Sequence, residues 1–198
     1  ANLIANDAIE RVILNGEARA YGLEFLLRKN TGAFTGWLAY TLSKSEQRTP
    51  GGNAGGPGIN NGNWYYNPYD RTHDLSFTGV YRLNKKWRFS ANILYQTGRP
   101  VTYPTGQYQY EGLSIASYSD RNSDRLPAYH RIDISAILVP GKPNKKWQGE
   151  WVFGIYNIYN RRNAASISFS QNRQTGLNEA TRIAIFGIVP SVTYNFKF

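Results

Sequence analysis

The sequence predicts an all-β protein, and more narrowly an antiparallel up-and-down transmembrane β-barrel. Apolar and polar residues alternate with a period of two over most of the 198 residues, as in strands whose two faces meet different surroundings. The connections between the alternating segments are short and long in turn, which is typical of outer-membrane barrels. The alternation also runs unbroken to the aromatic last residue, Phe198.

The amino-acid composition agrees with a transmembrane β-barrel. Aromatic residues make up 15% of the chain, with 15 Tyr, 9 Phe and 5 Trp. Tyr and Trp combine an apolar ring with a polar group and therefore suit surfaces where lipid meets water. Mean hydropathy is nevertheless on the polar side, and no apolar run is long enough for a membrane-spanning helix. A polar average with many aromatics fits lipid-facing residues that alternate with residues facing a wet lumen.

The first two alternating segments predict a hairpin. Residues 16–29 form the first predicted strand, because apolar side chains occupy every second position from Tyr21 to Leu27. Asn30-Thr31-Gly32 is typical of a short turn. The alternation resumes over residues 34–46, which are the second predicted strand.

A long loop separates this hairpin from the next one. Residues 47–69 break the alternation, and their glycine-rich part, 51–58, predicts a loop without an element of its own. A third strand is predicted over 71–83, and a tight turn at 84–86 leads into a fourth strand over 87–101.

The remaining connections are again long and short in turn. A second long loop is predicted near 102–127, before a fifth strand over 128–139. The Pro- and Gly-containing segment 140–144 is the expected turn into a sixth strand over 147–160. A third long loop or irregular connection occupies about 162–182.

The seventh predicted strand, 183–198, ends the chain. From Phe186 onward every second position is apolar or aromatic, apart from a proline, so one face is expected in lipid and the other in a polar lumen. Its end resembles the signal by which the outer-membrane assembly machinery recognises barrel substrates. The residues that carry this resemblance are Tyr194, Phe196 and Phe198.

Seven strands predict that residues 1–198 are the C-terminal portion of one outer-membrane β-barrel domain. Its C-terminus is expected in the periplasm, with long outward loops near 47–69, 102–127 and 162–182. Bacterial barrels close with an even number of strands, and the chain lacks an initiator Met and a leader, so we expect a barrel that begins upstream of Ala1. An eighth strand within 1–14 and a soluble all-β domain are the alternatives.

Charge and residue chemistry narrow the possible functions. The net charge is +10, but the basic residues are scattered over predicted turns and loops, which disfavours nucleic acid and suits lipopolysaccharide, outer-membrane lipid or an acidic partner. The chain has no Cys, and only His73 and His130 are candidates for acid–base or metal chemistry. His73 and Asp74 are strand neighbours and should face opposite sides. The sequence therefore predicts no catalytic residue, no metal site, no cofactor and no enzyme.

Aromatic residues in two predicted loops are candidate ligand contacts, because Tyr offers an amphipathic surface with few rotatable bonds. The alternative is that they sit at the rim at the level of the lipid headgroups. The candidates are Trp64, Tyr65, Tyr66, Tyr103, Tyr108 and Tyr110.

Nearly the whole chain resembles the C-terminal barrel region of TonB-dependent receptors, particularly the type found in Bacteroidetes. The segments that carry the resemblance are 16–25 (GEARAYGLEF), 36–43 (GWLAYTLS), 69–76 (YDRTHDLS), 127–133 (PAYHRID), 156–161 (YNIYNR) and 190–198 (PSVTYNFKF). The resemblance implies an outer-membrane barrel of about 22 strands with a plugged lumen. It also implies that TonB is contacted through upstream regions that this sequence does not contain.

The function that the resemblance implies is energy-coupled uptake of a large solute, such as a siderophore, metal complex, glycan or peptide. A surface lipoprotein or another subunit of an envelope complex is a possible partner. The alternative function is a receptor-like barrel that acts as a structural subunit of a secretion or barrel-assembly complex. A small adhesin-like barrel is a third hypothesis, which would require these residues alone to close a barrel.

Overall fold

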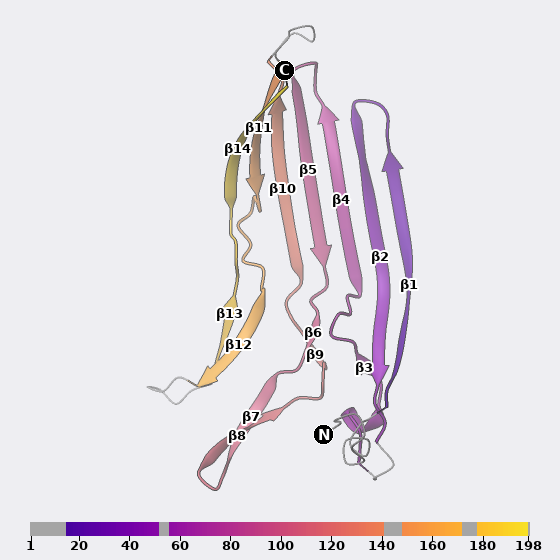
Figure 1. Ribbon diagram of the computed structural model, residues 1–198, viewed down its shortest axis with the longest axis vertical. Coiled ribbons are helices and arrows are strands. Elements are labelled where there is room, and N and C mark those ends of the chain that lie inside the picture. The colour runs from indigo at the N-terminus through magenta and orange to yellow at the C-terminus, as the bar shows by residue number, and fades with distance from the viewer. Residues whose placement is uncertain (1–14, 52–55, 141–147, 172–177, 198) are drawn as a thin grey trace, which may run out of the picture. The chain divides into compact units, whose positions relative to one another are not determined.

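The computed structural model describes residues 15–51, 56–140, 148–171 and 178–197. These residues form an all-β structure in which every strand pair is antiparallel (Figure 1). Their one helical element is a short 3-10 turn, Asn60–Gly62. No helix formed by the described residues is long and apolar enough to cross a membrane.

Seven long strands form a meander, in which each strand lies beside the one before it. Their order in the sheet is β1-β2-β4-β5-β10-β11-β14, with the short strand β3 (Tyr65–Tyr66) paired to β2. The long strands are β1 (Glu17–Lys29), β2 (Phe34–Arg48), β4 (His73–Arg82), β5 (Trp87–Gln96), β10 (Tyr129–Leu138), β11 (Gln148–Tyr156) and β14 (Val189–Lys197). The all-β class, the antiparallel up-and-down order and all seven predicted strands are thus confirmed.

The described part of the sheet does not close on itself. β1 has β2 as its one neighbour and β14 has β11, so both are edge strands among the described residues. Closure into a barrel therefore stays a prediction.

Some predicted strand ends are wrong, and side chains explain why. The sixth strand ends at Tyr156 rather than near residue 160, because Asn157 adopts a φ of +54° and starts a turn. The last strand begins at Val189 rather than at residue 183, because the backbone N–H of Ile188 donates to the Asn160 side chain at 3.0 Å instead of to a strand. The fourth strand ends at Gln96 and not at residue 101.

The predicted irregular loops contain hairpins, which is a second correction. β7 (Pro104–Tyr110) pairs with β8 (Leu113–Tyr118), and β12 (Ser166–Gln171) pairs with β13 (Asn178–Ile183). At the base of the first hairpin, β6 (Pro100–Val101) pairs with β9 (Asp124–Arg125). The β7–β8 turn has positive φ at Glu111 and Gly112, and the Glu concealed a signal that Asn or Asp would have given.

The chain divides into two compact units. The first holds residues 1–22, 43–71 and 98–126, and the second holds residues 23–42, 72–97 and 127–198. The first unit contains β3 and the β7–β8 hairpin, whereas the second contains most of the long strands.

The strand register of the second unit sorts side chains into rows. Directly paired residues of neighbouring antiparallel strands point to the same face, so a row of partners shows what each face carries. One row on the apolar face is Phe34, Tyr81, Phe89, Ala136, Phe153 and Val192. The adjacent row on the opposite face is Thr35, Val80, Ser90, Ser135, Gly154 and Ser191. The alternation seen in the sequence therefore becomes two distinct faces.

Gly36 marks a close approach between β2 and β4, where it pairs with Gly79. A Cβ atom at Gly36 would lie 2.2 Å from the backbone oxygen of Thr78, so an added methyl group must push the two strands apart. We expect Gly36→Ala to lower the free energy of unfolding by about 1–3 kcal/mol, the usual range for overpacking. Urea unfolding followed by tryptophan fluorescence measures this change.

Gly106→Ala is the matched control, because no atom lies within 4 Å of a Cβ atom built at Gly106. It should leave the unfolding midpoint almost unchanged. Equal stability of the two variants would show that the β2–β4 contact is not as tight as described.

Candidate functional site

The second unit exposes its apolar face, which is the reverse of a soluble sheet. Large apolar side chains are exposed there: Phe25 is 56% exposed, Phe89 41% and Val192 64%. Among the Ala, Val, Ile, Leu, Phe, Tyr and Trp residues that the structure describes, only Tyr65 and Leu126 are buried. The described strands therefore do not enclose an ordinary apolar core.

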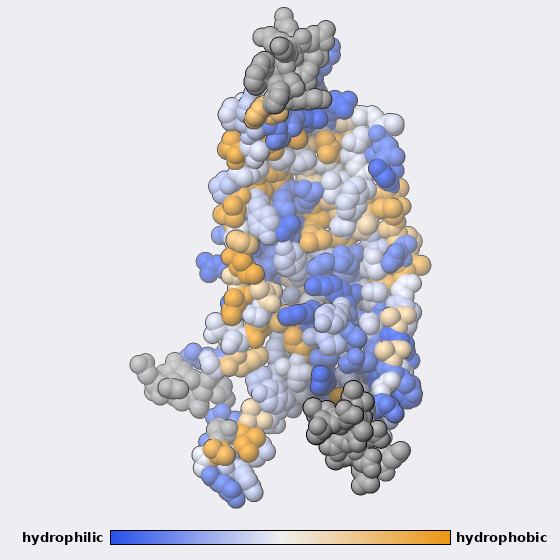
Figure 2. Space-filling view, viewed as in Figure 1, coloured by the Kyte–Doolittle hydropathy of each residue, from blue (hydrophilic) through white to orange (hydrophobic). Residues whose placement is uncertain are grey.

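The opposite face of the same strands is polar and internally hydrogen-bonded. Arg88 donates to Glu150 at 2.7 Å, and Asn195 donates to the same carboxylate at 3.1 Å. Further contacts on this face include Gln96–Asp74 at 2.8 Å, Ser90–Ser135 at 2.8 Å and Arg131–Asp133 at 3.0 Å. Figure 2 shows hydrophilic side chains gathered over the middle of the sheet, with apolar side chains along its flanks. Such a face suits a wet environment in which partners stay hydrated.

Aromatic rings gather on the apolar face at the turn-bearing end of the sheet, which is the end that carries the short turns 30–33 and 83–86. Trp151 packs against Tyr194 with 4.7 Å between ring centroids, and Tyr194 stacks on Phe196 at 6.3 Å. Trp87 stacks on Phe89 at 6.2 Å. Tyr194 and Phe196, two of the three residues predicted as an assembly signal, thus belong to this aromatic end of the sheet, whereas Phe198 lies outside the described residues.

A second aromatic cluster lies at the other end of the same face, and it contains both histidines. The Tyr40 hydroxyl lies 2.9 Å from Nδ1 of His73, and the two rings stack. His130 stacks on Tyr95, and its Nδ1 lies 2.8 Å from the Tyr159 hydroxyl. Each histidine thus has a tyrosine as its hydrogen-bonding partner. Asp74 lies on the opposite face, where it accepts from Gln96, as strand alternation requires.

The two aromatic clusters are separated by a distance that matches a membrane. On β5 they begin at Trp87 and Tyr95, eight residues apart. A rise of about 3.4 Å per residue places these two side chains about 27 Å apart along the strand. Strand tilt shortens this height, and outer-membrane barrels carry an apolar band about 25 Å tall between two aromatic girdles.

In the first unit, a buried carboxylate holds the connection between β3 and the long strands. Asp70 is 2% exposed, accepts from the backbone N–H of Ser45 at 2.6 Å and pairs with Arg125. The Arg125 guanidinium also lies over the Tyr66 ring, 4.4 Å from its centroid. Asn122 donates to the backbone oxygen of Tyr66 at 2.7 Å. These contacts order segments that are far apart in the sequence.

The six predicted ligand contacts fall into different environments. Tyr65 is 6% exposed, and its hydroxyl lies 3.2 Å from that of Thr49, so it packs inside the first unit. Trp64 lies beneath Arg19, 4.1 Å from the ring centroid, and Tyr66 lies beneath Arg125. Burial, and then the carboxylate of Asp124, raise the pKa of the half-buried Tyr103.

Tyr108 and Tyr110 differ from the other four candidates. They are 55% and 58% exposed on β7, and the facing strand β8 exposes Leu113 and Tyr118. Of the six predicted residues, these two offer the most open rings to a ligand or partner. Leu113 pairs with Tyr110 and lies on the same face, whereas Tyr118 is exposed on the opposite face of the hairpin, and only the alternation within 107–118 could have signalled them in advance.

Sequence reasoning missed two buried polar residues that shape the connections. Asp70 is one, and Asn157, 1% exposed, is the other. The Asn157 side chain bonds to both the backbone N–H and the backbone oxygen of Arg161, while its own N–H donates to Asp133. An Asn with positive φ is a local signal for such a turn. The partner of Asp70 has no local signal, because Arg125 follows 55 residues later.

Comparisons of the chain with protein-family models, with curated proteins and with solved structures give no match. No group of three or more His, Asp or Glu in the described ranges could hold a metal ion. Function is therefore inferred from the inverted faces of the second unit, its two aromatic clusters and the ordered connections of the first unit.

The buried Asp70 generates a stability prediction. Asp70→Asn keeps the shape of the side chain but removes the charge that Arg125 faces, and a hydrogen bond to a charged group is worth about 1.5–3 kcal/mol. We expect thermal unfolding at a lower temperature and faster proteolytic cleavage within residues 98–126. Both are measured on purified protein.

Asp120→Asn is the control, since Asp120 is exposed and its carboxylate makes no contact with a described residue. It removes the same charge and should leave cleavage unchanged. Equal behaviour of Asp70→Asn and Asp120→Asn would contradict the ordering role of the Asp70–Arg125 pair.

Proposed function

We propose that this chain forms part of the wall of an outer-membrane β-barrel that takes up a large solute in a TonB-dependent manner. The observation that carries the proposal is the inverted sheet of the second unit, with an exposed apolar face between two aromatic clusters. The residue stretches that resemble TonB-dependent receptors support the narrower statement about energy-coupled uptake.

The exposed apolar face supports a lipid environment on energetic grounds. Moving a single Phe or Leu side chain out of water is worth about 1.5–3 kcal/mol, and the apolar face carries many such side chains. Large contiguous apolar surfaces on soluble monomers are rare. Lipid would solvate these side chains, whereas a wet lumen would solvate the Arg, Asp and Glu side chains of the other face.

The connections support an orientation. Adjacent strands are joined by short turns at 30–33 and 83–86, whereas the three connections at the other strand ends are long, and two of them contain a hairpin. Short turns are periplasmic and long loops extracellular in outer-membrane barrels. In this orientation the C-terminus is periplasmic, and the exposed Tyr108 and Tyr110 belong to an extracellular loop where a solute is first met.

The proposed solutes are a siderophore, metal complex, glycan or peptide, and TonB would be contacted by segments outside residues 1–198. A second candidate is a structural subunit of an envelope complex for secretion or barrel assembly. The exposed apolar surface of the β7–β8 hairpin favours it, because Tyr108, Tyr110 and Leu113 on one face of the hairpin would together suit a protein partner.

Two adjacent residues of β5 test the proposed lipid-facing side. Ile93 lies on the apolar face and Asn92 on the polar face. An Arg on the lipid face near the membrane middle costs about 2–4 kcal/mol, whereas an Arg facing the lumen is tolerated. We expect Ile93→Arg to lose most of the folded protein in the outer-membrane fraction, measured as the band that shifts on heating before electrophoresis.

Asn92→Arg is the matched control and should retain the heat-shifted band at the wild-type level. A soluble sheet would give the opposite order, because its exposed apolar face would accept the Arg of Ile93→Arg. A wild-type protein that is found in the soluble fraction and shows no heat shift would refute the barrel wall altogether.

A further inference from the structure

The turn-bearing end of the second unit concentrates positive charge. The described basic residues there are Arg28, Lys29, Arg82, Lys85, Lys86 and Arg88. Arg88 is neutralised by Glu150 at 2.7 Å. The sequence holds no acidic residue from 25 to 45 or from 75 to 110, so the other five have no carboxylate nearby in the chain. No described carboxylate pairs with them either. Basic residues that look scattered in the sequence thus collect at one end of the sheet.

The turn between β4 and β5 presents two lysines from a fixed backbone. The Asn84 side chain accepts from the backbone N–H groups of Lys86 and Trp87 at 2.8 and 2.9 Å. The backbone oxygen of Lys86 accepts from Val139 at 2.8 Å, which ties the turn to the end of β10. Lys85 and Lys86 are both exposed. The same four residues, Asn-Lys-Lys-Trp, recur at 144–147, outside the described residues.

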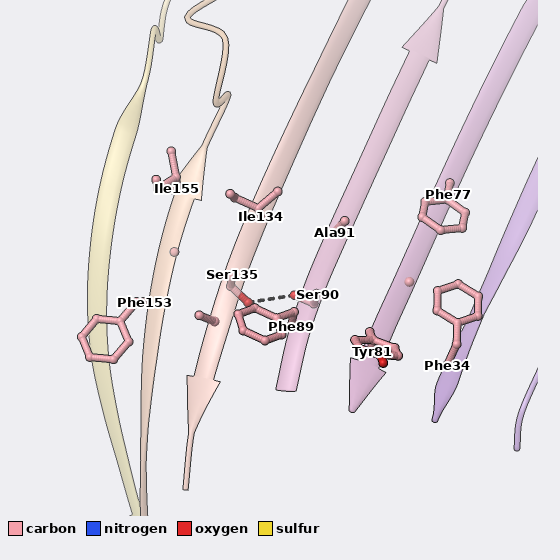
Figure 3. A pocket seen from close by; sticks show the side chains of 13 residues that line it. Phe34, Phe77, Tyr81, Phe89, Ser90, Ala91, Ile134, Ser135, Phe153 and Ile155 are labelled. Carbon is pink, nitrogen blue, oxygen red and sulfur yellow. Dashed lines mark hydrogen bonds between the residues drawn. The ribbon is translucent and has the colours of Figure 1, made fainter. Parts of the chain in front are cut away.

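An apolar hollow lies on the apolar face of the strands that this turn joins and of their neighbours. Small residues, including Gly79, Ala91 and Ala136, leave a depression of about 500 Å³ between larger side chains. Figure 3 shows Phe34, Phe77, Tyr81, Phe89 and Phe153 around it. Phe89 follows Lys86 by three residues, which places them roughly 10 Å apart along the strand. The basic turn and the apolar hollow are therefore neighbours along β5.

We propose that this end of the sheet is a binding site for an anionic glycerophospholipid. The phosphate of the headgroup lies against Lys85 and Lys86, and one acyl chain lies in the hollow beside Ala91. The inference rests on the proposed placement in the outer membrane and adds a specific lipid to it. Charge complementarity selects an anionic headgroup, because Lys85 and Lys86 in the turn and Lys29 on the apolar side of β1 have no carboxylate partner among the described residues, whereas Arg28 and Arg82 lie on the polar face.

The position of the basic residues also indicates which anionic membrane lipid binds. In the proposed orientation the basic end faces the periplasm, whereas the long loops face outward. Lipopolysaccharide was one expected destination of the basic residues, but it would meet the loop end. The basic turns meet the periplasmic leaflet, so the proposed occupant is a phospholipid.

Native mass spectrometry tests the site on the protein as the cell makes it, purified in detergent and mixed with equal amounts of phosphatidylglycerol and phosphatidylcholine. The wild type should retain phosphatidylglycerol in preference to phosphatidylcholine. Lys85→Gln with Lys86→Gln should lower phosphatidylglycerol retention about 25-fold, at about fivefold for each lysine at a membrane surface. Ala91→Phe, which fills the hollow, should lower the retention of both lipids and leave their ratio unchanged.

Arg121→Gln with Arg162→Gln is the matched control, because it removes two exposed charges that do not belong to the site. It should bind lipid as the wild type does. Each variant is first checked for the heat-modifiable band in the outer-membrane fraction, which reports membrane placement independently of lipid binding.

The outcomes separate the two proposals. Variants that insert normally and retain phosphatidylglycerol at the wild-type level would overturn the lipid site and leave the barrel wall standing. Retention of lipopolysaccharide in place of phosphatidylglycerol, abolished in the double lysine variant, would overturn the choice of lipid. A wild type absent from the membrane fraction would remove the premise of both.

Discussion

The register of β5 between β4 and β10 is the constraint on which the other features depend. Ile93 pairs with Phe77 on one side and with Ile132 on the other, so one face is apolar across three strands. The neighbouring Asn92 pairs with Thr78 and Asp133 on the other face. A slip of one residue would move every apolar side chain to the polar face, and the hydrogen bond between Ser90 and Ser135 would be lost. The two faces exist because this register is kept.

Along β5 the type of side chain changes in the same order as the layers of a membrane. Lys85 and Lys86 precede the strand, Trp87 is its first residue, Ala91 lies near its middle and Tyr95 lies one residue before its end. Charged, aromatic, apolar and again aromatic zones follow one another in the order expected from one headgroup layer to the next. Backbone groups in such a wall are satisfied by strand pairing, which lipid demands because it offers no hydrogen bonds. The sheet edges at β1 and β14 are where further pairing would be required.

The long strands could be predicted because the pleat gives alternation a direct structural meaning, and the seven periodic segments are strands. The β7–β8 hairpin was concealed by Glu111 in a position that usually holds Asn or Asp. Tyr65 was expected to be a ligand contact, but it pairs with Gln47 and is buried, and the local sequence does not show this pairing. The Asp70–Arg125 pair and the basic end both unite distant segments, so they become visible only after the strand order is known.

Site-directed spin labelling along β5 tests the inverted sheet most directly, and the absence of native Cys allows one label at a time at residues 88–96. Collision of each label with oxygen, which concentrates in lipid, is compared with its collision with a water-soluble nickel complex, in membranes that contain the protein. The account predicts high oxygen contact at 89, 91, 93 and 95 and high nickel contact at the even positions. Nickel contact at the odd positions would contradict it, because the apolar face would then lie in water.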